Sequence, residues 1–212
     1  MKAIIFDLGN VLLPIDLDLT YQAFSAFSPY DAATIGQKIQ QEGLWIPYES
    51  GKQTDHEFRE HIRFHLDLNC TDAEFDEAFS ALLLSYHTGV YEWILSLKSK
   101  FSLYLLSNTS SIHAKRFTQV PLGPSGENLF GLFDQVYFSF DMGLVKPDTA
   151  IYQQVLIEQN LQVQEVLFFD DNVANINSAK GLGIASYLID PAKDFSQIQE
   201  ILDSYVSQQS DF

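Results

Sequence analysis

Short apolar runs alternate with longer segments of helical periodicity along the later part of this sequence, and no other feature limits the fold as strongly. The apolar runs are FSLYLLS, FDQVYFSF, EVLFFD and IASYLID, and KAIIF at the start is a fifth. Between the later runs, segments such as DTAIYQQVLIEQN are typical of helices. Strands that alternate with helices form a mainly parallel sheet covered on both faces by right-handed crossovers. The sequence therefore predicts an α/β fold.

Residues 17–86 differ from this alternating pattern. The segments LTYQAFSAF, TDHEFREHIRFHL and TDAEFDEAFSALLLSY have apolar residues at spacings of three and four, and we expect no strand among them. Thr54 and Thr71 are expected to cap two of these helices, and Glu57 stands where a capping box needs it. We expect two domains, an α/β core of residues 1–16 and 87–212 and an inserted helical cap of residues 17–86.

The charge and cysteine content exclude several classes of partner. With 28 acidic and 12 basic residues the formal net charge is −16, so we expect neither nucleic acid nor an anionic membrane as a partner. No apolar run approaches the ~20 residues that span a bilayer, and Asp7 interrupts the apolar start, so we expect no signal peptide. Cys70 is the only cysteine, which excludes an intrachain disulfide and favours the cytoplasm. The oligomeric state is left open.

Polar clusters follow the apolar runs, where open α/β sheets bind their ligands. Acids that converge at such a place repel one another, by about 4 kcal/mol for two carboxylates about 4 Å apart at an effective dielectric near 20. A cation is therefore expected among them, and oxygen ligands favour a hard one such as Mg²⁺. The clusters jointly predict a metal-assisted phosphate site, and they are Asp7 with Gly9 and Asn10, Ser107 with Asn108, Lys146, and Asp170 with Asp171.

In this order, the four clusters resemble the haloacid dehalogenase superfamily of phosphatases over nearly the whole chain. FDLGNVL, LLSNT, GLVKPD and FFDDNVANI are similar to the members typified by bacterial alpha-glucose-1-phosphatases. The resemblance implies a Rossmann-like parallel sheet with strand order 3-2-1-4-5 and a small helical cap domain inserted after the first strand.

The resemblance also implies a nucleophile and a metal site. Asp7 would attack phosphorus and become an aspartyl-phosphate, which splits one difficult displacement into two easier ones. The Asp7 carboxylate, the Gly9 carbonyl and Asp171 would bind Mg²⁺. Asp170 would act through a water in the same site, although the two adjacent acids could exchange these roles.

Further residues are assigned to the substrate by the same resemblance. Ser107 and Asn108 would donate hydrogen bonds to the phosphoryl oxygens. Lys146 would neutralise charge on Asp7 and on the phosphoryl group, which stabilises the transition state. Asn175 lies four residues after Asp171 on the expected helix, and it either orients the acids or Lys146 or is an ordinary polar residue of that helix.

The sequence departs from the family pattern at Gly9. Most phosphatases of the superfamily carry an Asp there, as the acid for the leaving group and then the base for water. Such a group is worth about 10²–10⁴ in rate. An acid from the cap could replace it, and the candidates are Glu49, which we expect to contact the substrate, and Asp16. Alternatively, a bound water could serve, which would favour an anomeric phosphate.

We therefore expect a Mg²⁺-dependent phosphatase that acts on a small phosphorylated metabolite, with a sugar phosphate such as glucose 1-phosphate favoured. A catalytically weak protein that binds or senses such a metabolite is the alternative that Gly9 suggests. A dehalogenase also uses an aspartate nucleophile but needs no metal, so Asp170 and Asp171 argue against it. Trp45 and Tyr48 stand near Glu49, and they would either stack on a sugar ring or belong to the core of the cap.

Overall fold

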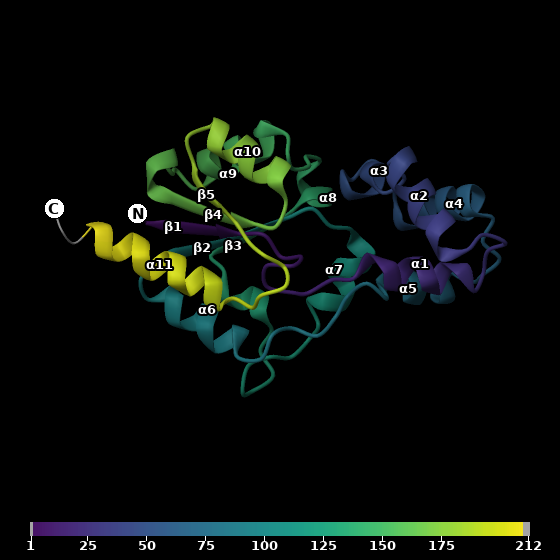
Figure 1. Cartoon of the computed structure of the whole chain (residues 1–212), viewed down its shortest axis with the longest axis horizontal. Helices are drawn as coiled ribbons and strands as arrows, with labels where there is room; N and C mark the ends of the chain where they lie inside the picture. Colours follow the sequence, from purple (N-terminus) through teal and green to yellow (C-terminus); the bar gives the residue numbers. More distant parts are fainter. Residues whose placement is uncertain (1, 210–212) are drawn as a thin grey trace.

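A computed structural model of the chain describes residues 2–209. Its sheet has five strands, all parallel, in the order β3-β2-β1-β4-β5 (Figure 1). The predicted α/β fold class and the predicted strand order are therefore confirmed. The strands are β1 (Ala3–Phe6), β2 (Ser102–Ser107), β3 (Gln135–Phe138), β4 (Val166–Asp170) and β5 (Ala185–Leu188).

Both faces of the sheet are apolar, because helices cover both. Successive side chains of a strand point to opposite faces, so Ile4 and Phe6 of β1 pack into one core while Ala3 and Ile5 pack into the other. Helices α6 and α11 contribute to the first core, and α9 and α10 to the second (Figure 1). The bounds are α6 (Val90–Lys98), α7 (Ser111–Phe117), α9 (Thr149–Glu158), α10 (Val173–Gly181) and α11 (Ser196–Gln209).

Five further helices, which we call the helical module, lie beyond the carboxyl ends of the strands (Figure 1). Phe24, Phe58 and Phe79 are among the buried residues of an apolar cluster that the module builds largely from its own side chains. Thr54 and Thr71 both form complete capping boxes, with Glu57 as predicted and also with Glu74. The helices are α1 (Leu17–Ser25), α2 (Ala32–Glu42), α3 (Ile46–Glu49), α4 (Asp55–Leu66) and α5 (Asp72–Ser80). The division into core and cap domains stays a prediction.

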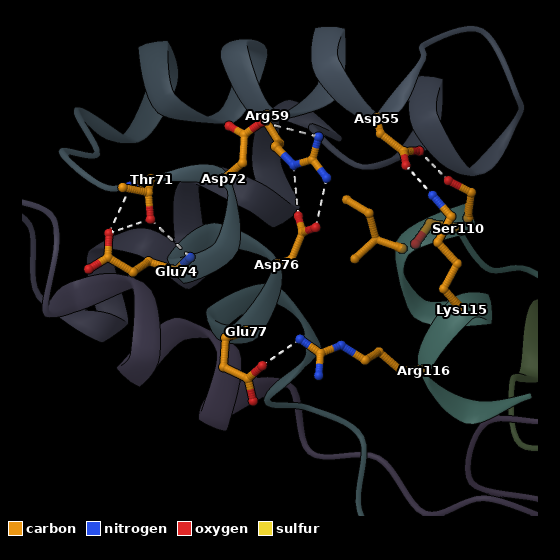
Figure 2. A network of polar contacts seen from close by, with 12 residues as sticks. Asp55, Arg59, Thr71, Asp72, Glu74, Asp76, Glu77, Ser110, Lys115 and Arg116 are labelled. Carbon is orange, nitrogen blue, oxygen red and sulfur yellow. Dashed lines mark hydrogen bonds and ion pairs between the residues drawn. The ribbon is translucent and has the colours of Figure 1, made fainter. Parts of the chain in front are cut away.

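Helix α7 is one of the elements through which the helical module contacts the rest of the protein. Lys115 of α7 donates to Asp55 of α4 at 2.6 Å, and Arg116 forms an ion pair with Glu77 of α5 (Figure 2). Within the module, Arg59 binds both carboxylate oxygens of Asp76 at 2.7 Å (Figure 2). Because α7 follows the loop after β2, these contacts connect the module to the edge of the sheet where the polar clusters were predicted.

One predicted strand is shorter than its apolar pattern. FDQVYFSF covers residues 133–140, but β3 ends at Phe138 and the short helix α8 (Ser139–Met142) follows. The Ser139 hydroxyl accepts from the Thr109 N–H at 3.0 Å and donates to the Thr109 carbonyl at 3.2 Å. These bonds turn the chain toward the loop after β2, so the strand cannot continue. No helix in residues 2–209 is long and apolar enough to cross a membrane.

Candidate active site

Asp7 and Asp170 lie side by side at the carboxyl edge of the sheet, because β1 and β4 are neighbours in register. Phe6 pairs with Phe169, and Asp7 and Asp170 follow these two residues. The Asp7 N–H donates to the Phe169 carbonyl at 2.9 Å. Asp7 is 8% exposed and Asp170 is 0% exposed, so two carboxylates are placed together where little water reaches them.

Lys146 lies between these two acids. Its ammonium donates to Oδ1 of Asp7 and to Oδ2 of Asp170, each at 2.7 Å, and to the Leu106 carbonyl at 2.9 Å. Lys146 is only 4% exposed, and its three donors are all used. The predicted convergence of Lys146 with the acids of β1 and β4 is therefore present in the structure.

One lysine does not compensate the negative charge of this cluster. Burial raises the pKa of Asp7 to about 7; Lys146 opposes that rise, while Asp170 and Asp171 add to it. Burial also raises the pKa of the Asp171 carboxyl. Burial by itself lowers the pKa of Lys146, but the attraction of Asp7 and Asp170 outweighs it and raises the pKa above the usual lysine range. Three acids beside one cation leave a site that favours a further positive charge.

Asp170 is held more completely than its neighbour Asp171. Oδ1 of Asp170 accepts from the Asn172 N–H at 2.8 Å, and both of its carboxylate oxygens accept from the Asn175 side chain at 3.0 Å. The interpretation of Asn175 as a residue that orients the acids is therefore the one the contacts support. Together with Lys146, these donors occupy both oxygens of Asp170.

Asn10, which the sequence places in the first polar cluster, supports the site through a contact that the sequence did not reveal. Its side chain donates to Oδ2 of Asp171 at 3.0 Å and accepts from the Ile15 N–H at 3.1 Å. Its φ is 56°, a left-handed conformation that Asn tolerates better than most residues. The only signal in the sequence was an Asn directly after Gly9, which indicated a turn but not a contact with Asp171.

The acidic cluster fits a magnesium ion. Asp7, Asp170 and Asp171 each place a carboxylate oxygen within 4.8 Å of the other two. Among residues 2–209, neither Oδ2 of Asp7 nor the Gly9 carbonyl oxygen takes part in a hydrogen bond. A set of oxygen donors with net negative charge is what a hard divalent cation requires.

Ser107 and Asn108 follow β2 at the same edge, but their side chains differ in what they contact. The Asn108 side chain donates to the Lys146 carbonyl at 2.8 Å and accepts from the Lys146 N–H at 2.9 Å. Asn108 therefore fixes the backbone of Lys146, a contact that the sequence analysis missed. The Ser107 hydroxyl makes no hydrogen bond within the described part of the chain, and Ser107 lines a cavity of about 90 Å³.

Glu49 of the helical module lines that same cavity, together with Gly9, Ser107 and Asn108. Burial raises the pKa of its carboxyl to about 7. Trp45 also lines the cavity, whereas Tyr48 is buried in the apolar cluster of the module. Of the two interpretations given to these aromatic residues, Tyr48 fits the apolar cluster of the module, whereas Trp45 both lines the cavity and packs against that cluster.

Comparison with known proteins gives the family. A family model described as haloacid dehalogenase-like hydrolase matches residues 1–183. The chain belongs to this family. The hydrolase is similar to a D-ribitol-5-phosphate phosphatase from Bacteroides thetaiotaomicron, with 29% identity over 197 residues that cover 93% of this chain and 96% of that protein.

Solved structures agree with this assignment. A family enzyme from Bacteroides thetaiotaomicron, in complex with magnesium and inorganic phosphate, has a TM-score of 0.83 at 29% identity and covers 93% of this chain and 98% of its own. A predicted hydrolase of the same family from Porphyromonas gingivalis has a TM-score of 0.86 at 29% identity, with coverage of 95% and 98%. An L-2-haloacid dehalogenase from Xanthobacter autotrophicus has a TM-score of 0.61 at 20% identity, with coverage of 89% and 77%, which is a likeness of fold alone.

Proposed function

We propose that this hydrolase is a Mg²⁺-dependent phosphatase that cleaves a small phosphomonoester through an aspartyl-phosphate on Asp7. The observation that carries the proposal is the position of Lys146, at 2.7 Å from both Asp7 and Asp170 on the carboxyl edge of the sheet, with Asp171 close by. A site that pairs a buried nucleophile with a fixed cation and a metal-binding cluster suits a phosphoryl group, which carries several negative oxygens.

Asp7 can act as the nucleophile because its two oxygens have different surroundings. Oδ1 is held by Lys146, and Oδ2 is free of hydrogen bonds among residues 2–209. We propose that Lys146 favours the ionised form of Asp7, by opposing the rise in its pKa, and faces the charge that develops on the phosphoryl oxygens. The free hydroxyl of Ser107 would donate to one of those oxygens, with Asn108 beside it.

Mg²⁺ would be held by the Asp7 carboxylate, the Gly9 carbonyl and Asp171. When bound, it would neutralise phosphoryl oxygens and orient the phosphorus toward Asp7. Asp170, whose oxygens are occupied by Lys146, Asn172 and Asn175, would support the site through a water.

The substrate class follows from the relatives and from the helical module. We propose a sugar or polyol phosphate, since a relative with 29% identity is a D-ribitol-5-phosphate phosphatase and the sequence motifs favour glucose 1-phosphate. The helical module, in the role of the predicted cap, would set the choice, because Trp45 and Glu49 line the cavity beside Ser107.

The test is a phosphatase screen with Mg²⁺ or with EDTA. The panel contains D-ribitol 5-phosphate, glucose 1-phosphate, other sugar phosphates, nucleotides and p-nitrophenyl phosphate. Asp7→Asn is run in parallel, with Asp31→Asn as the matched control, because Asp31 is an exposed helix cap that Asn replaces well. We expect turnover that requires Mg²⁺, is lost in Asp7→Asn and is kept in Asp31→Asn.

Gly9 favours a second candidate, a protein that binds a phosphorylated metabolite with little turnover. The usual acid is absent at this position, and an apolar side chain borders its place, because a Cβ added at Gly9 would lie 3.3 Å from Cδ1 of Ile15. If the wild type hydrolyses no member of the panel but is stabilised by phosphate ligands, this candidate replaces the phosphatase.

A further inference from the structure

The place of the missing acid at Gly9 is bordered by an apolar side chain. Cδ1 and Cγ1 of Ile15 would lie 3.3 and 3.9 Å from a Cβ at Gly9, and no other atom outside the adjacent residues would lie within 4 Å. The Gly9 backbone has no positive φ that would require glycine. Gly9 itself supplies no proton donor for the leaving group, so the donor is either a bound water or a side chain from another element.

Among residues 2–209, Glu49 is the one acid that lines the cavity next to Gly9 and Ser107. Within the described part of the chain, no ion pair or hydrogen bond engages its carboxyl, and burial alone raises its pKa to about 7. A carboxyl with a pKa near neutrality can donate a proton in one step and accept one in the next. Burying a carboxyl without a partner lowers the stability of the fold, so a contribution to stability does not explain the position of Glu49.

The residues on either side of Glu49 are anchored to the α/β core. The Tyr48 hydroxyl donates to Asp55 at 2.8 Å and accepts from the Ile112 N–H of α7 at 3.2 Å. Gly51 has a φ of +69°, and a Cβ there would lie 2.2 Å from the Phe140 carbonyl oxygen, so the turn after Glu49 lies directly on α8. These two anchors fix the end of α3 against the core and hold Glu49 at the cavity.

Two other titratable residues are poorer candidates. His113 lines the cavity, but its Nε2 is 3.0 Å from the Phe79 carbonyl, and burial lowers its pKa to about 4. Asp16, the other acid considered from the sequence, is exposed and caps α1 by accepting from the Asp18 N–H. Glu49 and His113 are the titratable side chains lining this cavity among the described residues.

We propose that Glu49 is the general acid and base of this enzyme, an inference that rests on the phosphatase activity proposed above. In the first step an oxygen of Asp7 bonds to phosphorus, the bond from phosphorus to the leaving oxygen breaks, and Glu49 gives its proton to that oxygen. In the second step water bonds to phosphorus, the bond to Asp7 breaks, and Glu49 takes a proton from the water. The products are an alcohol and inorganic phosphate, and Glu49 ends protonated as it began.

The test compares Glu49→Gln with the wild type on two substrates, an alkyl phosphate that the wild type turns over and p-nitrophenyl phosphate. The alkyl leaving group needs a proton and nitrophenolate does not. We expect kcat/KM for the alkyl phosphate to fall by about 10²–10⁴. With the aryl phosphate, we expect a burst of one equivalent of nitrophenolate and then slow turnover, because the second step lacks its base. The descending limb of the wild-type kcat/KM profile, which reports loss of the Glu49 proton near pH 7, should disappear.

The matched control is Glu42→Gln, the same change at an exposed residue of the helical module that pairs with Lys38 and does not line the cavity. It should keep wild-type kinetics. The folding check uses thermal melting between pH 5 and pH 8. Since burial raises the pKa of folded Glu49 above its unfolded value, the wild type should lose stability relative to Glu49→Gln as the pH rises through about 7.

The outcomes separate the two proposals. An equal loss of kcat/KM on both substrates, with an unchanged pH profile, would refute the role of Glu49 and leave it a structural residue. Full activity in Glu49→Gln would also refute it. If the wild type is active and Asp7→Asn is not, the phosphatase proposal stands whatever Glu49→Gln does. If the wild type cleaves no phosphate of the panel, both proposals fail.

Discussion

Replacing Lys146 by Met tests whether this lysine is what allows two buried carboxylates to lie together. Lys146→Met keeps a side chain of similar length but removes the charge that contacts Asp7 and Asp170 at 2.7 Å. The carboxylate oxygens of these acids lie within 4.8 Å of each other. At that distance and an effective dielectric of 20, their uncompensated repulsion is about 3.5 kcal/mol. This agrees with the roughly 3–5 kcal/mol lost when one partner of a buried ion pair is removed.

The assay is thermal and urea unfolding in EDTA, at pH 5.5 and pH 8.5. For a chain of this size a loss of 3–5 kcal/mol lowers Tm by roughly 6–20 °C. Asp7 has a folded-state pKa of about 7, above its value in the unfolded chain. The stability that depends on its protonation is therefore present at low pH and lost as the pH rises through the folded-state value. We expect the deficit of Lys146→Met to be large at pH 8.5 and smaller at pH 5.5, and Mg²⁺ to restore part of it at pH 8.5.

The matched control is Lys115→Met, which removes an ion pair with Asp55 in which the lysine side chain is 69% exposed. Exposed pairs contribute about 0–1 kcal/mol, so this variant should melt close to the wild type. A deficit below about 1 kcal/mol for Lys146→Met at pH 8.5, or an equal deficit at both pH values, would refute the electrostatic account.

Two further predictions concern the supports of the site. Asn175→Ala removes the donor that contacts both oxygens of Asp170, and we expect a loss of about 1.5–3 kcal/mol by urea unfolding; an unchanged midpoint would mean that Asn175 contributes nothing to holding the acid. Gly51→Ala places a Cβ 2.2 Å from the Phe140 carbonyl oxygen, whereas Gly143, with nearly the same φ of +68°, has nothing within 4 Å. We expect Gly143→Ala to cost about 1 kcal/mol for its backbone conformation alone, and Gly51→Ala to cost clearly more and to lower the turnover of alkyl phosphates. Equal melting temperatures for the two variants would contradict the close approach of α3 to α8.

The contacts that complete the site could be found only in the structure. The expectation that Asn108 binds the phosphoryl group stays a prediction, and only the structure shows that its side chain holds the backbone of Lys146. Asn10 donates to Asp171, which is 161 positions away in the chain. Amide side chains serve many partners, so their type and spacing in a sequence do not identify the atom that they contact.

The sequence by itself determined the architecture and the chemical groups of the site. Strand-like runs and helical periodicity predict a parallel α/β sheet, because each pattern matches the period of one element. Asp7 and Asp170 were predictable because each stands at the carboxyl end of an expected strand, and Lys146 because GLVKPD resembles a motif of the family. These are local properties, and a sequence records local properties directly.

Tertiary structure alone decided how these groups act on one another. The contacts of Lys146 with two acids depend on the packing of β1 beside β4, and the cavity that Glu49 lines depends on the position of α3 against α8. Burial and distance set the pKa values, since the cost of a charge depends on the water and the charges around it. The sequence could therefore name Glu49 as a candidate to replace the acid missing at Gly9, but only the fold places it beside Ser107 without a partner.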